Sequence, residues 1–366
     1  MKATALCLIL AAGLPNAMAC TAVDVTAKDG SVVAGRTMEW FYDMQWTLVS
    51  FPQGTKYSLT APPSLKLPDV AQTAKYGFIG VAPGVISGNA ILEGQNTAGL
   101  GMSGNFLPGF TEYQTVSRRD KHFVSILDFG TWALSSFASV EELKKALPGI
   151  KVWYDDSLPS GPTPPYLHMV FTDRTGQGIV VEFVGGEMKI HDNAAHVLTN
   201  APTYDWHLTN LRNYLSVGTA TRESVEIGKK NIAELGSGGN TMALRADYSP
   251  PSRFVRIAFL RQFSPQPQSS ADALQLVAHL LNNVDIPMGV AGVTSPKETV
   301  WDTTQWVALK DLTNNRFYIA DYDHRLGYAQ FDLNRLAKQS APSRIPVTAI
   351  PYPSPADVTS SLSGTH

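Results

Sequence analysis

The sequence is poor in cysteine, in charge of one sign and in long hydrophobic runs. Two cysteines in 366 residues cannot build the disulfide scaffold on which many small exported domains depend. Lys and Arg number 29 against 31 Asp and Glu, and no basic run exceeds two residues, so we expect no nucleic-acid partner. No apolar stretch reaches the roughly 20 residues of a membrane span, so no span is predicted. A hydrophobic content of 44% is that of an ordinary globular protein with a substantial core.

The N-terminus has the pattern of a secretory signal peptide. Lys2 supplies the positive charge, residues 5–14 (ALCLILAAGL) form a short apolar segment, and Ala17-Met18-Ala19 matches an A-x-A cleavage site. The apolar segment has about half the length of a membrane span, which disfavours an uncleaved anchor. We therefore expect a signal peptide over residues 1–19, cleavage before Cys20, and a periplasmic or secreted mature protein.

Cys20 then becomes both the first residue and the only cysteine of the mature chain. A single exposed terminal cysteine indicates either lipid attachment or chemical use of the thiol. A lipoprotein signal usually has a long or branched aliphatic residue three positions before the cysteine, where this chain has Ala17. A terminal cysteine combines a nucleophilic thiol with an α-amine that titrates near pH 8 and can act as a general base. Both alternatives, a lipoprotein and a cysteine hydrolase, remain open at this point.

Hairpins with helices between them follow from Cys20 onward. Alternating apolar residues and turn signals predict hairpins over residues 20–40, 78–106, 168–197 and 304–321, with turns at 29–30, 175–176 and 185–186. Helical spacing covers residues 123–147, with Ser139 as a cap and Pro148 as the stop, and residues 271–283. This arrangement predicts an α+β fold rather than a regular parallel one. We expect one domain over 20–340 and a Ser/Pro-rich tail over 341–366.

Several polar residues interrupt apolar segments and are candidates for the chemistry of an N-terminal thiol. Such a thiol needs a nearby cation and donors for an oxyanion. Arg36, Arg253, Asn105 and Asn200 each lie in apolar, strand-like surroundings, where any one of them taken alone is more simply explained as a satisfied structural polar group. An aromatic cluster over residues 40–46 is either core or the lining of an acyl pocket. The histidines show no metal-ligand spacing and the glycines no nucleotide-binding motif, so we expect neither a metal nor a cofactor.

Five segments together resemble the choloylglycine hydrolase family of bile salt hydrolases and penicillin V acylases, which are N-terminal nucleophile hydrolases. The segments are Cys20-Thr21, residues 35–40 (GRTMEW), 96–109 (NTAGLGMSGNFLPG), 198–214 (LTNAPTYDWHLTNLRNY) and 252–259 (SRFVRIAF). They occur in the family's order and with similar spacing. The resemblance implies a four-layer αββα sandwich. Because the precursor is exported and Glu39 replaces the family's common Asp, the chain looks most like the penicillin V acylases of Gram-negative bacteria.

The resemblance also implies roles for single residues. Cys20 matches the nucleophile and Arg36 the arginine beside its thiol. Glu39 stands where an Asp usually binds the terminal amine, and its extra methylene requires a different rotamer. Asn200 matches the side-chain donor of the oxyanion hole and Asn105 the position that donates its backbone N–H, while Arg253 matches the second active-site arginine. We also expect Trp40, Trp46 and Phe106 to bind the substrate.

The implied activity is hydrolysis of a linear, non-peptide carboxamide through a thioester at Cys20. A small-molecule N-acyl amide is the expected partner, of the penicillin V or conjugated bile acid type. Two alternatives remain: deacylation of N-acyl homoserine lactones by the same mechanism, and a non-enzymatic lipoprotein lipidated at Cys20. The resemblance further implies a homotetramer.

Overall fold

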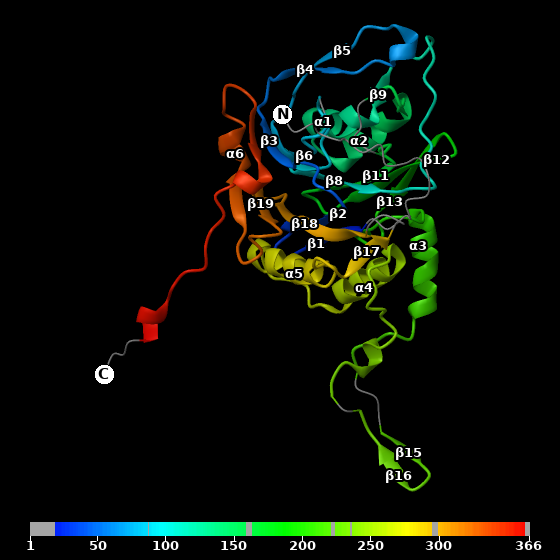
Figure 1. Cartoon of the computed structure of the whole chain (residues 1–366), viewed down its shortest axis with the longest axis vertical. Coiled ribbons are helices and arrows are strands. Elements are labelled where there is room, and N and C mark those ends of the chain that lie inside the picture. Colours follow the sequence, from blue (N-terminus) through cyan, green and yellow to red (C-terminus); the bar gives the residue numbers. More distant parts are fainter. Residues whose placement is uncertain are drawn as a thin grey trace.

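A computed structural model describes residues 19–86, 88–158, 163–220, 224–234, 236–294 and 299–362. The signal peptide predicted for residues 1–19 therefore lies, except for Ala19, outside the described residues. Within the described ranges, no helix has the length and apolar character needed to cross a membrane. Four helices and two large sheets make up most of the fold (Figure 1).

The first sheet is built around the N-terminal hairpin. Strands β1 (Cys20–Thr26) and β2 (Val32–Trp40) pair in antiparallel register, with Cys20 opposite Met38. Gly30 adopts a φ of +86° in the connecting turn, a conformation that glycine reaches without the clash a Cβ causes. The strand order is β14-β1-β2-β18-β19-β20, with β17 beside β18. The further members are β14 (Val197–Leu198), β17 (Ala291–Thr294), β18 (Thr299–Asp311), β19 (Arg316–Asp321) and β20 (Ala329–Asp332).

The second sheet contains the two central hairpin regions of the chain. Its order is β13-β12-β11-β8-β7-β6-β3-β21, all in antiparallel pairs. The strands are β3 (Thr47–Phe51), β6 (Phe78–Ala82), β7 (Glu93–Asn96), β8 (Leu100–Phe106), β11 (Leu167–Asp173), β12 (Gly178–Val184), β13 (Glu187–Asp192) and β21 (Ser343–Pro346). The turns predicted at 175–176 and 185–186 are confirmed, since Gly176, Gly185 and Gly186 all have positive φ.

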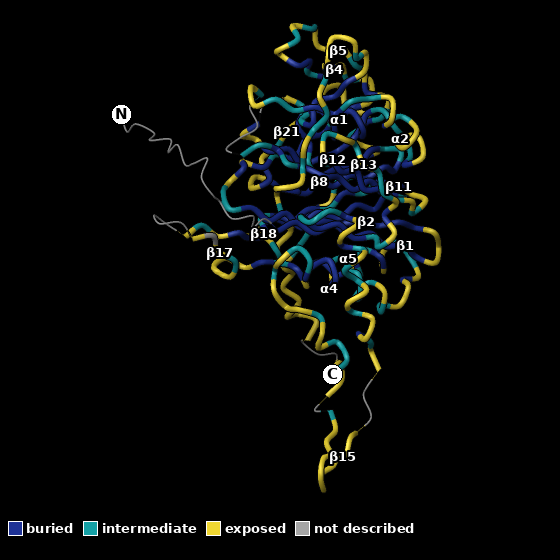
Figure 2. The backbone as a smooth tube through the Cα atoms, turned by 90° about the vertical axis from the view of Figure 1, so that its right-hand side faces the viewer, coloured by how far each residue is buried: buried dark blue, intermediate teal, exposed yellow. Residues whose placement is uncertain are grey.

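Helices cover the outer face of each sheet, which confirms the four-layer αββα sandwich (Figures 1 and 2). Helices α4 (Pro250–Phe263) and α5 (Ser270–Asn282) pack on the first sheet, and α1 (Ile126–Ser136) and α2 (Val140–Ala146) on the second. A capping box at Ser269 starts α5, and Ser139 caps α2 as predicted. Figure 2 shows the buried backbone concentrated in the two central layers.

Apolar side chains fill the spaces between these layers. The larger core cluster includes Met38, Trp306, Phe129 and Phe171 and lies between the two sheets and under α1. A second cluster, with Val23, Phe254 and Leu281, joins the first sheet to α4 and α5. Because side chains alternate along a strand, β1 and β2 contribute to both clusters. Cys20 faces the space between the sheets, whereas the residue after it faces the helices.

Smaller elements complete the chain. They are β4 (Lys56–Leu59), β5 (Val70–Thr73), β9 (Phe123–Ser125), β10 (Lys151–Trp153), α3 (Tyr204–Asn210), β15 (Val225–Ile227), β16 (Lys230–Ile232) and α6 (Leu333–Leu336). The hairpin of β15 and β16 extends away from the body, as does the C-terminal end of the chain (Figure 1).

Three local expectations differ from the structure. Arg253 lies in helix α4 and not in a strand, because Pro250 occupies the first turn of a helix, where its missing N–H is not needed. Residues Phe123–Ser125, the first three of the helix predicted over 123–147, form strand β9, and the helix begins at Ile126. The tail expected from residue 341 also starts later, since β21 pairs with β3 and adds residues 343–346 to the second sheet.

Candidate active site

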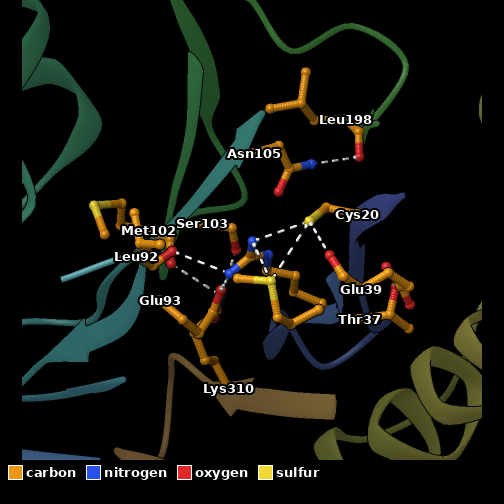
Figure 3. A network of polar contacts seen from close by, with 12 residues as sticks. Cys20, Thr37, Glu39, Leu92, Glu93, Met102, Ser103, Asn105, Leu198 and Lys310 are labelled. Atoms are coloured by element: carbon orange, nitrogen blue, oxygen red, sulfur yellow. Dashed lines mark hydrogen bonds and ion pairs between the residues drawn. The ribbon is translucent and has the colours of Figure 1, made fainter. Parts of the chain in front are cut away.

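Cys20 begins β1 at the centre of the molecule. Its side chain is 1% exposed and faces the space between the two sheets. Arg36 lies one strand away, opposite Ala22, and its Nη2 donates a hydrogen bond to the Cys20 Sγ over 3.3 Å. Figure 3 shows the sulfur at the edge of a continuous network of polar contacts. The predicted pairing of a cationic side chain with the thiol is therefore present in the geometry.

A buried charge network holds Arg36 in place. Its Nη1 donates to the Leu92 carbonyl oxygen at 3.3 Å and lies 3.9 Å from the Glu93 carboxylate, and its guanidinium stacks over Trp306 at 5.2 Å. Lys310 forms an ion pair with Glu93 from the far side and donates to Ser103 Oγ at 2.8 Å (Figure 3). Two cations around one anion leave a net positive charge near the sulfur.

The Cys20 nitrogen is held by the loop that follows β14. It donates to the Asn200 Oδ1 at 2.7 Å. Arg253 Nη2 donates to the same oxygen at 2.8 Å, and its Nη1 donates to the Cys20 carbonyl oxygen at 2.7 Å and to the Thr21 Oγ1 at 2.6 Å. The backbone of the nucleophile candidate is thus clamped on both sides by two of the predicted residues.

Asn105 and Asn200 link the two sheets beside Cys20. The Asn105 Nδ2 donates to the carbonyl oxygen of Leu198 at 3.2 Å (Figure 3). It also donates to the carbonyl oxygen of Thr199 at 2.8 Å. In return, the Asn200 Nδ2 donates to the carbonyl oxygen of Phe106 at 2.9 Å. No other described residue accepts the second hydrogen of that amide, which leaves it for a substrate oxygen.

Glu39 occupies the opposite face of β2, toward the helices. It accepts hydrogen bonds from Thr304 at 2.6 Å and from Thr37 at 3.1 Å. Burial raises the pKa of Glu39 to about 8, while Arg253 acts in the opposite direction. Its backbone N–H donates to the Ala19 carbonyl oxygen at 3.1 Å, so the backbone of Glu39 is bonded to the residue that precedes Cys20.

The pKa of the Cys20 thiol is raised, because the cost of burying a thiolate exceeds the favourable effect of Arg36. Glu39 adds to the increase. The expectation that Arg36 favours the thiolate is correct in direction, but burial outweighs it. At neutral pH the sulfur therefore carries its proton, and nucleophilic attack requires a base.

A cavity of about 610 Å³ opens in front of the sulfur. Trp40, Trp46 and Phe106, the three predicted substrate-binding residues, all line it together with Cys20 and Arg36. Trp40 and Phe106 meet edge to face with ring centroids 5.3 Å apart. The remaining lining is almost wholly apolar, as is typical of a site for a small organic ligand.

The sequence interpretation missed Asp302, Glu93 and Lys310. All three are charged and at most 2% exposed. Asp302 and Lys310 lie in β18 among apolar and β-branched residues, the same signal that singled out Arg36. Among the described residues, no three His, Cys, Asp or Glu side chains come together as a metal site.

Comparison with known proteins agrees with this geometry. The sequence profile of the linear amide C–N hydrolases, choloylglycine hydrolase family, matches residues 20–339. The bile salt hydrolase/transferase of Clostridium perfringens is 30% identical over 310 residues, which cover 83% of this chain and 90% of that protein. The penicillin V acylase of Pectobacterium atrosepticum is 28% identical over 181 residues, 48% of this chain and 47% of that one.

Solved structures show the same fold. A variant of conjugated bile acid hydrolase from Clostridium perfringens superposes with a TM-score of 0.78 at 28% identity, covering 89% of this chain and 97% of the other. Penicillin V acylase from Agrobacterium tumefaciens shares the fold with a TM-score of 0.70 at 23% identity, over 89% and 91% of the two chains. The profile match begins at Cys20, the residue around which the site is built. The chain therefore belongs to the choloylglycine hydrolase family of linear amide C–N hydrolases.

Proposed function

We propose that this protein, once residues 1–19 are removed, hydrolyses a linear carboxamide with an uncharged, apolar acyl group, using Cys20 as an N-terminal nucleophile. The observation that carries the proposal is the position of Cys20. Its sulfur faces an apolar cavity beside Arg36, and its nitrogen is bound to Asn200 on the other side. Both groups that the reaction needs therefore come from one residue.

The mechanism follows from the protonation of the thiol. Since burial keeps the proton on the Cys20 sulfur, the free α-amine must accept it as the sulfur attacks the amide carbonyl carbon. The negative charge that develops on the carbonyl oxygen is stabilised by the remaining N–H of Asn200 and, as the family resemblance implies, by the backbone N–H of Asn105. The amine product leaves with the proton, and water then hydrolyses the thioester and frees the sulfur.

The cavity favours an acyl group without charge. Arg36 is the only charged side chain among the described residues of its lining, and that guanidinium is already bound to the sulfur, to Leu92 and to Trp306. An unpaired charge on the acyl group would lose its hydration among aromatic and aliphatic walls. Phenoxyacetyl, steroid and long alkyl acyl groups all satisfy this condition, so penicillin V, a conjugated bile acid and a long-chain N-acyl homoserine lactone are the substrates to compare.

Lipidation of Cys20, the alternative function, is disfavoured by burial. A thioether-linked diacylglycerol needs the cysteine at the surface, facing a membrane. Cys20 is instead 1% exposed, its backbone is paired with Met38 of β2, and its nitrogen donates to Asn200 on the other side. We propose export to the periplasm or the medium on the strength of the signal sequence alone, with cleavage rather than lipidation as the processing step.

A homotetramer is the expected assembly. The hairpin of β15 and β16 exposes apolar side chains, with Val225 at 61% and Ile227 at 67%. A two-stranded hairpin of this length is only marginally stable in water by itself. Contact with a second copy of the chain would bury these side chains.

Substitution of the nucleophile tests the proposed reaction. Cys20→Ala should lower the rate of amide hydrolysis on the order of 10⁶-fold, the loss that removal of a catalytic nucleophile causes. Release of amine is measured with penicillin V, glycocholate and a long-chain acyl homoserine lactone, and intact mass shows which residue is first. A chain that starts at Ala19 is the matched control, because it keeps the thiol but moves the amine by one residue, and it should be inactive as well. Appreciable hydrolysis by either protein would sink the mechanism.

A further inference from the structure

Asp302 is a buried acid for which the proposed mechanism has no use. It is 2% exposed, and its Oδ1 has no hydrogen-bond partner among the described residues. The backbone of Ala19 donates to the same carboxylate. A buried carboxylate oxygen without a partner is costly, so its presence here requires an explanation.

The strand register places Asp302 beside the nitrogen of Cys20. Thr304 of β18 lies opposite Glu39 of β2, and the Glu39 N–H binds the carbonyl oxygen of Ala19, the residue just before β1. Asp302 is two residues before Thr304, so its side chain shares the face of Glu39. Removal of residues 1–19 takes away Ala19, the residue that both acids now contact, and leaves a charged amine on the next residue.

The two acids near the Cys20 nitrogen have fewer cations than negative charges around them as long as that nitrogen is an uncharged amide. Glu39 and Asp302 bring two acids, and Arg253 brings one cation that lowers the pKa of both. Burial nevertheless raises the pKa of Asp302 to about 7 and that of Glu39 to about 8, because the cost of burying each carboxylate exceeds the effect of Arg253, and the charge of Asp302 adds to the increase at Glu39. A terminal ammonium on Cys20 would supply the missing positive charge.

We infer that Asp302 is a positioning residue that, together with Glu39, binds the free α-amine of Cys20 and sets the pH range in which this amine can act as a base. The inference rests on the proposed function only in requiring that Cys20 be the first residue. Glu39 is anchored by Thr304 and Thr37, and Asp302 supplies the unanchored oxygen.

Other charged groups around the amine remain unchanged in the test. The groups that face or lie behind the Cys20 nitrogen and Asp302 are the Cys20 thiol, Arg36 and Glu39 from β1 and β2, Arg253 and Arg256 from α4, and His207 from α3. Removing the negative charge of Asp302 destabilises the ammonium, and it also makes the thiolate easier to form. Both effects move the titration of the coupled pair to lower pH.

The experiment uses alkylation of the mature protein by iodoacetamide, because Cys20 is its only thiol and no substrate is needed. Asp302→Asn keeps the size of the side chain. In the plot of alkylation rate against pH it should lower the midpoint by about one pH unit, and the acid limb of the kcat/KM profile should move by the same amount. Asp302→Glu should titrate like the wild type. Asp128→Asn is the matched control, since Asp128 is buried in α1 with a raised pKa but lies outside the site.

The outcomes separate this inference from the proposed function. If Asp302→Asn, with Cys20 verified as first residue, titrates like the wild type, Asp302 has no role at the amine, whatever the activity. If the shift occurs but no amide is hydrolysed, Asp302 does bind the amine and the proposed reaction is wrong. Should Asp302→Asn not fold, Asp302→Ser supplies the same test. If Asp302→Glu shifts the pH midpoint of alkylation as much as Asp302→Asn does, the shift comes from packing and not from the charge, which contradicts the inference.

Discussion

Arg36, Glu93 and Lys310 are charged side chains in apolar surroundings, and the effect of Arg36 on the Cys20 sulfur depends on the other two. Arg36 can act on the Cys20 sulfur only while Glu93 is shared with Lys310. Without the lysine, Glu93 would have Arg36 as its one cationic partner and would offset the positive charge at the sulfur. The ion pair behind the site therefore contributes to its chemistry as well as to its stability.

Substitution of the lysine tests this dependence. Lys310→Met should lower the free energy of unfolding by about 3 to 5 kcal/mol, because it leaves a buried carboxylate without its closest partner. The double variant Lys310→Met/Glu93→Gln removes both charges and should recover much of that loss. Urea unfolding of the two proteins measures the difference. Equal stability of the single and double variants would mean that Glu93 does not need the lysine.

At the level of helices and strands, the sequence predicted those features that depend on residues close together in the chain, such as turns and helix caps. The turn at Gly30 and the capped start of α2 follow from residues only a few positions apart, whereas the capping box of α5 at Ser269 was not predicted. Helix α4 was missed because its two prolines suggest a break when its place in the fold is unknown. The neighbours of Arg36 could not be predicted either, since they depend on the register between strands far apart in sequence.

The hairpin of β15 and β16 is the element least explained by contacts within the chain. Val225, Ile227 and Ile232 all present apolar side chains to solvent there. If they bind other copies of the chain, replacing all three by Thr should reduce the molar mass in solution from that of a tetramer and leave the fold of each copy intact. Light scattering and circular dichroism measure these two quantities. A wild-type protein that is already a monomer would exclude this role for the hairpin.

For the molecule as a whole, the two sheets meet at the cavity, and the C-terminal segment is bonded to the backbone of Trp46, one of the residues that line it. Strand β21 pairs with β3, and the Val347 N–H donates to the Trp46 carbonyl oxygen at 2.8 Å. Val347 and Ile350 are buried in the core between the sheets. The C-terminal segment thus supports the aromatic segment that lines the cavity in front of Cys20.

Two truncations separate this support from the exposed end. Deleting residues 341–366 removes β21 and two buried apolar side chains, so the free energy of unfolding should fall by about 3 kcal/mol or more. The loosened Trp46 should raise KM more than it lowers kcat, because the groups that act on the amide remain in place. Deleting only residues 354–366, which are exposed where the structure describes them, should change neither the free energy of unfolding nor the KM. Thermal unfolding and steady-state kinetics of the two truncated proteins provide the comparison. If both have the same stability and KM, the cavity does not depend on β21.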